Sequence, residues 1–303
     1  MSRWKTLSLF VVLSAIWGLS FVAVKAAVES VPPVFLAALR FDIAGILLIA
    51  YSFLTGKRVR PLSRSELKIA AIGGFFFVAV HHALLFIGQQ YITSSVAGVV
   101  IATDPILAAA LSYLLLTGSS FQRHRVTGTV LGLLGIGIVA DPSLDQIVST
   151  NVIGVGLVFL SALSFALGGV LTEYFRADAP LTSMQGWMMA VGAPLLHLIS
   201  YVLPTEPAAA ANWDQAAIVG LLYLAVISGC VGYLIYFRLL DVLGAAETNL
   251  IGYVAPCFAT LGGWLLLGET LAFSTVVGFV VILTGFILIK LPNIRNILDE
   301  RVY

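Results

Sequence analysis

Ten long hydrophobic stretches dominate this sequence, and each approaches the roughly 20 residues that an α-helix needs to cross a bilayer. They leave 10% of the 303 residues charged, against roughly 25% in an ordinary soluble domain. Lipid offers the backbone no hydrogen bonds, and the alternation typical of a membrane barrel is absent. We therefore predict an all-α polytopic membrane protein. Its ten transmembrane helices are expected at about residues 7–25, 34–54, 69–89, 95–116, 126–140, 152–172, 184–203, 216–237, 246–267 and 275–291.

The positively charged residues are strongly biased to one side of this topology. Of the 16 Lys and Arg residues, 14 fall on the side of the termini, and the exceptions are Lys25 and Arg40. The loops on the opposite side contain no Lys or Arg, and they span residues 90–94, 141–151, 204–215 and 268–274. This bias predicts a multi-pass protein of the cell membrane with both termini in the cytoplasm. The first stretch resembles a signal peptide, but its removal would disrupt this topology, so we expect it to be retained.

The two halves of the chain repeat each other. A shift of 147 residues aligns Pro33 with Pro180, and a shift of 151 aligns Pro105 with Pro256. Because each half has an odd number of predicted helices, the second half must enter the membrane from the opposite side. Inverted repeats of this kind place a substrate site near the midplane of the membrane. We therefore predict two inverted five-helix repeats, at residues 1–145 and 146–303.

Short motifs in both halves resemble those of a known family. They are Trp17-Gly18 with Phe21, Tyr91-Ile92-Thr93-Ser94-Ser95, Pro105, Leu243-Gly244-Ala245-Ala246-Glu247-Thr248, Pro256 and Leu266-Leu267-Gly268-Glu269-Thr270-Leu271. This set resembles the two repeats of the EamA domain in the drug/metabolite transporter superfamily. The resemblance implies a ten-helix inner-membrane carrier that exports amino acids or related metabolites through a central cavity. In one departure, the first half has Thr117-Gly118-Ser119-Ser120 where the second has Gly268-Glu269, so a symmetric pair of glutamates is missing.

Asp104 is the acidic residue placed deepest in a predicted span. It lies near the middle of the 95–116 stretch and precedes Pro105, whose missing N–H frees a carbonyl in the preceding turn. A charge at the bilayer centre costs about 2.5–3.5 kcal/mol, so such residues are often functional. We predict that Asp104 binds a substrate amine or carries a coupling proton. The alternative is a carboxylate that hydrogen-bonds a neighbouring helix. Pro105 and Pro256 are predicted to break their helices at the substrate site.

His81 and His82 are adjacent in the 69–89 stretch, so at most one is expected to face a cavity. Histidine titrates near neutral pH, which makes a proton relay with Asp104 conceivable. The alternative is a packed histidine bonded to a backbone carbonyl. Neither histidine has metal-ligand partners at usable spacing, so we predict no metal site and no cofactor.

Lys25 and Arg40 are the two cations on the otherwise uncharged outer side. They are candidates for the outer mouth of a path for solutes that bear a carboxylate. In the alternative interpretation, both side chains extend toward lipid headgroups, and Lys25 pairs with Glu29 one helical turn away.

Aromatic and small polar residues indicate the type of solute. The aromatic candidates for a cavity wall are Trp17, Phe21, Trp187, Tyr233 and Tyr253. A stripe of small and polar residues at helical spacing is predicted on the 246–267 helix, comprising Asn249, Gly252, Pro256, Thr260 and Gly263. A cavity with aromatic walls and few polar groups suits an amphipathic solute of amino-acid size. Packing in the helix bundle is the alternative role for each of these aromatic residues.

These patterns favour transport over other functions. There is no basic surface for nucleic acid, and the nucleophile, zinc-protease and phosphate-loop motifs of enzymes are absent. We predict a secondary transporter that exports amino acids or related small amphipathic metabolites by alternating access, with a channel, facilitator or non-transporting scaffold as the alternative. The predicted partners are a small-molecule substrate and membrane lipid. Glycines of two helices, Gly128, Gly132 and Gly135 with Gly278 and Gly285, indicate close packing or a homodimer contact.

Overall fold

The computed structural model describes residues 3–60, 63–115, 123–140, 150–175, 179–205 and 207–300. This part of the chain contains helices, turns and bends but no β-strand, so the all-α prediction is confirmed. The helices of the first half are α1 (Arg3–Ala27), α2 (Pro33–Leu54), α3 (Arg64–Gly73), η1 (Gly74–Val80), α4 (His81–Gln89), α5 (Ser94–Ile101), α6 (Asp104–Leu115) and α7 (Arg123–Ala140). Those of the second half are α8 (Thr150–Phe175), α9 (Leu181–Val202), η2 (Ala208–Ala210), α10 (Gln215–Leu222), η3 (Tyr223–Val231), α11 (Gly232–Leu243), α12 (Ala245–Thr248), α13 (Ile251–Leu267) and α14 (Phe273–Glu300).

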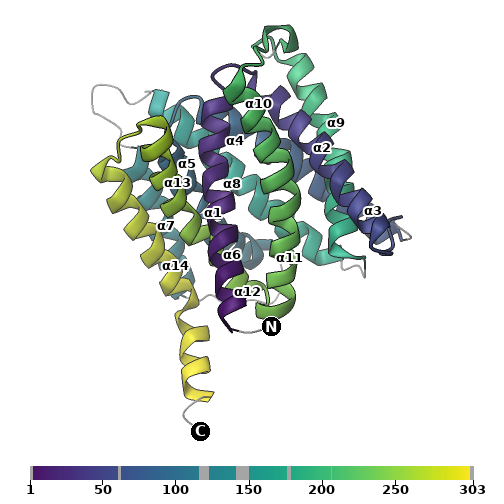
Figure 1. Ribbon diagram of the computed structural model, residues 1–303. Helices are drawn as coiled ribbons and strands as arrows, with labels where there is room; N and C mark the ends of the chain where they lie inside the picture. Colours follow the sequence, from purple (N-terminus) through teal and green to yellow (C-terminus); the bar gives the residue numbers. More distant parts are fainter. Residues whose placement is uncertain are drawn as a thin grey trace.

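The helices form one bundle, and α1 runs through its middle (Figure 1). On one side of α1 lie α13, α14 and α7, and on the other lie α10, α11, α2 and α9 (Figure 1). The beginning of α1 and the end of α14 lie at the same end of the bundle (Figure 1). The predicted boundary between the repeats, at residues 145 and 146, and the Thr117–Ser120 departure lie outside the described residues.

Every predicted span coincides with a helix or a run of consecutive helices. Six of these segments are long and apolar enough to cross a membrane, and three shorter apolar helices accompany them in the described part. The chain is therefore a multi-pass membrane protein. The count of ten crossings stays a prediction, since α9 is 22 residues long but does not belong to either group.

The third membrane segment of each half contains a π-helix. In the first half, α3, η1 and α4 run on without a break from Arg64 to Gln89, and in the second half α10, η3 and α11 run from Gln215 to Leu243. A shift of 151 residues places the last residue of η1, Val80, on the last residue of η3, Val231. Because π-helical turns often mark functional sites, this matched pair directs attention to the residues that follow them.

The two proline-containing helices differ. The fourth segment is interrupted at Ala102 and Thr103, between α5 and α6, and the Thr103 hydroxyl donates to the Val100 carbonyl at 2.7 Å. Pro105 is then the second residue of α6, where its missing N–H breaks no helical bond. Pro256 instead lies inside α13, which continues through it. The prediction that Pro256 breaks its helix is therefore wrong, and the interruption comes earlier, between α12 and α13.

Glycines bring α7 and α14 into close contact within one chain. A Cβ atom added at Gly135 would lie 2.8 Å from the Gly278 carbonyl oxygen, and one added at Gly285 would lie 2.5 Å from the Gly128 carbonyl oxygen. Gly132 lies against the Ile106 side chain of α6. Of the two interpretations of these glycines, the structure therefore shows packing within the bundle.

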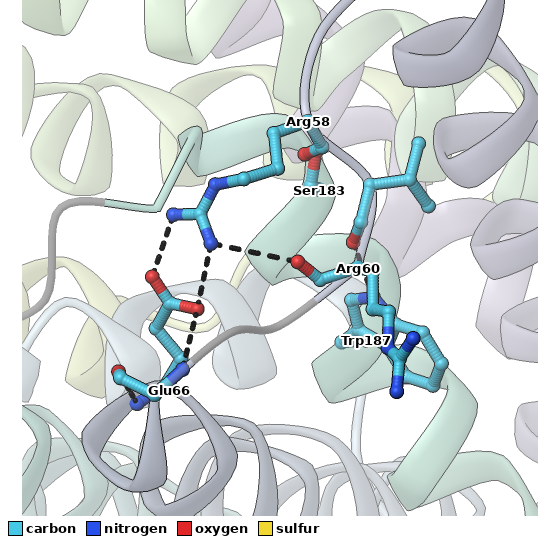
Figure 2. A network of polar contacts seen from close by, with 7 residues as sticks. Arg58, Arg60, Glu66, Ser183 and Trp187 are labelled. Carbon is cyan, nitrogen blue, oxygen red and sulfur yellow. Dashed lines mark hydrogen bonds and ion pairs between the residues drawn. The ribbon is translucent and has the colours of Figure 1, made fainter.

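The loop after α2 is fastened to α3 and α9. The Arg58 guanidinium donates to both carboxylate oxygens of Glu66, at 2.6 and 3.0 Å, while Glu66 also closes a capping box with Ser63 at the start of α3 (Figure 2). The Ser183 hydroxyl donates to the Arg58 carbonyl, and the Trp187 indole N–H donates to the Val59 carbonyl, each at 2.7 Å (Figure 2). Trp187, predicted as a cavity aromatic, thus holds a loop of the first half against a helix of the second half.

Candidate functional site

Arg40 is buried inside the bundle. It is the eighth residue of α2, about 10 Å along the helix from Pro33, and only 6% of its surface is exposed. Its guanidinium carbon lies 4.5 Å from the ring centroid of Phe41 and 5.7 Å from that of Phe86. The Arg40 Nε atom has no hydrogen-bond partner in the described part of the chain, and no described acidic side chain forms an ion pair with Arg40. The predicted placement of Arg40 at the outer mouth or among headgroups is therefore wrong.

His82 lies beside Arg40, and His81 points toward α8. The His82 ring contacts the Phe41 ring at 4.4 Å between centroids, and its Nδ1 atom lies 2.9 Å from the Phe77 carbonyl oxygen of η1. The Nδ1 atom of His81 lies 3.0 Å from the carbonyl oxygen and 2.8 Å from the hydroxyl oxygen of Ser161. Since a carbonyl only accepts, Nδ1 carries the proton in both of these bonds. In each imidazole ring Nε2 is therefore the polar atom that remains for another hydrogen bond.

An aromatic wall closes the site from the second half. Tyr233 on α11 lies close enough to Arg40 for a direct charge interaction, and its ring contacts Trp17 of α1 at 5.7 Å between centroids. Trp17 also contacts Tyr236 at 5.3 Å. The Tyr236 hydroxyl donates to Asn249 Oδ1 at 3.2 Å. Asn249 itself is exposed in the turn before α13, so its predicted place on a buried helical stripe is wrong.

The two halves contribute matching positions to this site. His82 follows the end of η1 by two residues, and Tyr233 follows the end of η3 by two residues. The same shift of 151 residues relates His82 to Tyr233 and Phe86 to Phe237. The site thus forms where the third segments of both repeats meet α2, and this correspondence was present in the sequence repeat.

Asp104 and Tyr253 lie elsewhere in the bundle. Asp104 begins α6, which packs against α7, α8 and α14, whereas α2 packs against α4, α9, α10 and η3. Asp104 interacts electrostatically with Tyr253, while His81 and His82 interact with Arg40. Within the described residues the structure therefore does not assemble a direct relay from Asp104 to the two histidines.

Phe21 and Lys25 join α1 to neighbouring helices at the end of the bundle opposite the N-terminus. Phe21 is half-buried, and its carbonyl oxygen accepts bonds from the Gln89 side chain at 2.9 Å and the Ser94 hydroxyl at 3.3 Å. The Lys25 ammonium donates to the carbonyls of Gln89 and Gln90, at 3.0 and 3.2 Å. Lys25 therefore caps the C-terminal end of α4, where a cation is favoured, and does not pair with Glu29.

Glu269 joins the two halves at the same end. Its carboxylate accepts from the Ser94 backbone N–H at 2.9 and 3.0 Å and from the Ser94 hydroxyl at 3.2 Å. A hollow of about 290 Å³ lies next to this contact, between α5 and α13. Its walls include Trp264 and Leu261, which are exposed on the outside of the bundle, and Thr260 of the predicted polar stripe, but neither Arg40 nor the two histidines. We therefore place the candidate site at Arg40 and not at this hollow.

Sequence reasoning missed several partners in the site. Phe41 belongs to α2, whereas Ser161 and Phe165 both belong to α8, and no local pattern links the two helices. Phe165 contacts His81 at 5.0 Å between ring centroids. The aligned pair Phe86 and Phe237 was the one available signal, because both stand at the same repeat position and both contribute rings to the site.

Comparison with known proteins gives a consistent result. The model of the EamA-like transporter family matches twice, at residues 4–140 and 152–291. An uncharacterized transporter of Archaeoglobus fulgidus is 30% identical over 95% of this chain and 99% of its own length. The uncharacterized inner membrane transporter YedA of Escherichia coli is 30% identical over 86% of this chain and 82% of its own. A crystal structure that covers 96% of this chain and 98% of its own aligns with a TM-score of 0.63 at 21% identity, which shows a shared fold.

Proposed function

This chain belongs to the EamA-like transporter family, and we propose that it is a secondary carrier that exports small organic solutes bearing a carboxylate, most simply amino acids or related amphipathic metabolites. The observation that carries this proposal is the buried Arg40 guanidinium, which has no acidic partner in the described part of the chain.

An unpaired cation inside the bundle favours an anionic ligand. Burying a charge without a counter-ion costs several kcal/mol, about 2.5–3.5 kcal/mol even on insertion scales, and a bound carboxylate offsets that cost. Guanidinium matches a carboxylate with two parallel N–H bonds. The rings of Phe41 and Phe86 hold the guanidinium from the side, which leaves its N–H edges to the ligand.

The surrounding rings favour an apolar part on the same solute. Trp17 contacts both Tyr233 and Tyr236, and Tyr233 lies near the guanidinium. A pocket with one fixed charge and aromatic walls suits an amphipathic molecule of amino-acid size. This reasoning supports the same solute class that the sequence resemblance implies.

The two matched halves support alternating access as the transport mechanism. We propose that the halves are inverted repeats that rock about the site, with both termini in the cytoplasm of a cell whose inner membrane holds the carrier. The contacts that join the halves at the two ends support this scheme, since one set must open when the other closes. These are the Glu269 contact with Ser94 at one end and the Ser183 and Trp187 contacts with the α2–α3 loop at the other. A homodimer stays a prediction.

Counterflow in proteoliposomes tests the proposal. Vesicles would be preloaded with one of a panel of amino acids, and the entry of a labelled trace of the same compound would be followed. Each amino acid would be compared with the amine that lacks its carboxylate and with the acid that lacks its amine. We expect saturable exchange of at least one carboxylate solute and none of its amine. Exchange of amines alone would contradict the role of Arg40, and flux that does not saturate would favour the channel alternative.

A further inference from the structure

A second polar site lies in the fourth segment, away from Arg40. Asp104 is the eleventh of the 22 residues from Ser94 to Leu115, so it is placed near the middle of a membrane-spanning segment. It follows the interruption at Ala102 and Thr103 directly. One of its carboxylate oxygens, Oδ1, is buried and has no hydrogen-bond partner in the described part of the chain.

Tyr253 of α13 carries a second buried polar atom that has no partner in the described chain. It is 9% exposed, its hydroxyl has no hydrogen-bond partner among the described residues, and it interacts electrostatically with Asp104. The Tyr253 ring packs on Phe286 of α14 at 4.4 Å between centroids. An unsatisfied buried polar group costs about 1–3 kcal/mol, and Asp104 and Tyr253 each contain one. Such atoms indicate groups that gain a partner in part of a working cycle.

The neighbouring helices offer Asp104 no cation. Residues 126–140 of α7, 150–172 of α8 and 273–289 of α14 contain no Asp, Glu, His, Lys or Arg. The titratable residues of these helices stand outside these ranges, with Arg123, His124 and Arg125 at the start of α7, Glu173 and Tyr174 at the end of α8, and Lys290 and later residues in the second half of α14. Within α13 the other titratable side chain is Cys257, which is exposed. A proton is therefore the cation best suited to neutralise Asp104.

We propose that Asp104 and Tyr253 form a proton-binding site, separate from the Arg40 substrate site, that couples transport to the proton gradient. In the proposed ionised state the Tyr253 hydroxyl turns to donate a hydrogen bond to the carboxylate, a bond that the structure does not contain. When hydronium transfers a proton to the carboxylate, one O–H bond of hydronium breaks, an O–H bond to the carboxylate forms, water is released and the negative charge of Asp104 is lost. The coupling part of this inference rests on the proposed function, whereas proton binding by Asp104 does not.

The proposed proton site and the Arg40 substrate site are separate, and this separation indicates how proton binding and transport are coupled. A proton and a solute that bind different residues can both be present, or be exchanged, as the halves rock. The repeat supports the asymmetry, because Asp104 aligns with Ala255 and a single acid therefore serves the whole chain. Tyr253 comes from the other half, so proton binding at this site bridges the two repeats.

Two measurements on reconstituted full-length protein test the inference. The first is infrared difference spectroscopy of the carboxylic-acid C=O stretch, titrated between about pH 5 and 9, on wild type, Asp104→Asn and Tyr253→Phe. We expect one band that disappears in Asp104→Asn and shifts in Tyr253→Phe. The exposed residues Asp241 and Tyr91 supply the controls Asp241→Asn and Tyr91→Phe, which should leave the band unchanged. A spectrum without an Asp104 band anywhere in the range would overturn the proton site.

The second measurement compares counterflow at equal pH with uptake driven by a pH gradient. We expect Asp104→Asn to keep counterflow within about threefold of wild type and to lose the acceleration by the gradient. Full acceleration in Asp104→Asn, or none in wild type, would overturn the coupling role. Absence of counterflow in the wild type would instead overturn the proposed function, and the infrared band would still decide whether Asp104 binds a proton.

Discussion

The two repeats share a backbone but differ in chemistry. Both have a π-helix in the third segment and a proline in the fourth, at positions related by one shift. Yet Arg40 of the first repeat aligns with Trp187 of the second, and Asp104 aligns with Ala255. His82 aligns with Tyr233, so an imidazole in the first repeat corresponds to a phenol in the second. The membrane-embedded charges therefore belong almost entirely to the first repeat.

This difference separates two requirements of a carrier. Motion about a central site needs two halves that pack alike, and the matched π-helices and glycine contacts meet that need. Binding one solute needs a single set of groups, and duplicating a buried charge would double its desolvation cost. The first repeat thus supplies the charges, while the second repeat supplies aromatic surface and loop contacts.

Removing the positive charge at Arg40 should have the largest effect on transport. Arg40→Gln removes the cation that we propose to bind the substrate carboxylate, a loss of about 3 kcal/mol, so we expect transport of the carboxylate solute to fall about 100-fold. Counterflow in proteoliposomes measures this.

Trp187, which aligns with Arg40 in the repeat, serves as the comparison. Trp187→Phe loses the bond to the Val59 carbonyl and should keep transport within about twofold, with a stability loss of about 1 kcal/mol. Arg238→Gln, at an exposed position on α11, controls for loss of positive charge. Equal loss of transport in Arg40→Gln and Trp187→Phe would remove the chemical difference between the repeats.

The packing between α7 of the first repeat and α14 of the second should be sensitive to added side-chain volume. A Cβ atom at Gly135 would lie 2.6 Å from Ile282 Cγ1, so Gly135→Val is expected to lower stability by about 1–3 kcal/mol, a decrease of several degrees in the melting temperature in detergent. Gly137, on the same helix, has no atom within 4 Å of such a Cβ, and Gly137→Val is the matched control. If the two variants melt at the same temperature, α7 and α14 do not pack as described.

Replacing Pro256 should raise stability, whereas replacing Pro105 should leave it almost unchanged. Pro256 is the sixth residue of α13, so it deprives the Gly252 carbonyl of its helical donor, and Pro256→Ala should raise stability by about 1 kcal/mol. Pro105→Ala should have almost no effect, because the first turn of α6 has no such bond to lose. Thermal unfolding of the two variants side by side measures the difference. A stabilised Pro105→Ala would place the helix interruption elsewhere.

The smallest effect concerns the caps of the third segments. Ser63 caps α3 and Asp214 caps α10, at positions that the 151-residue shift aligns. The Ser30 hydroxyl, which donates to Asp214 at 2.6 Å, and the Ala217 backbone N–H lower the pKa of the Asp214 carboxyl. Since the folded pKa lies below the unfolded value, the stabilisation is complete above the unfolded pKa and is lost as the pH falls through the folded pKa.

Asp214→Asn should therefore melt slightly below wild type at pH 7 and converge with it in acid. Ser63→Ala should lower the melting temperature by a similar amount at both pH values, because the Ser63 hydroxyl does not titrate. Melting curves at several pH values check both. A gap between Asp214→Asn and wild type that stays constant into acid would mean that the carboxylate charge does not contribute.

The sequence was sufficient for the positions of the helices, because hydrophobic length and the lack of backbone partners in lipid leave few other structures. The sequence was not sufficient to show how deeply a side chain is buried or which side chains it contacts. The predicted span 34–54 agrees with α2 to within one residue, but Arg40 was assigned to the outer mouth because a span does not reveal which neighbours pack around a side chain, and only contact with Phe41 and Phe86 shows that it is buried. Asp104 was correctly placed in mid-span, but its neighbour Tyr253 is 149 residues away, and no local pattern reveals such a pairing.

The matched π-helices also determine the direction in which the side chains that follow them point around the helix axis. Each π-helical turn holds more residues than an α-helical turn, so the side chains after it are rotated relative to an uninterrupted α-helix. If η1 closed into an α-helix at unchanged length, His82 would turn by about 100° relative to the residues before it, away from Arg40, whereas deleting one residue from η1 would offset that turn. The same relation holds between η3 and Tyr233. A change from π-helix to α-helix in either segment would therefore move one wall of the site relative to Arg40.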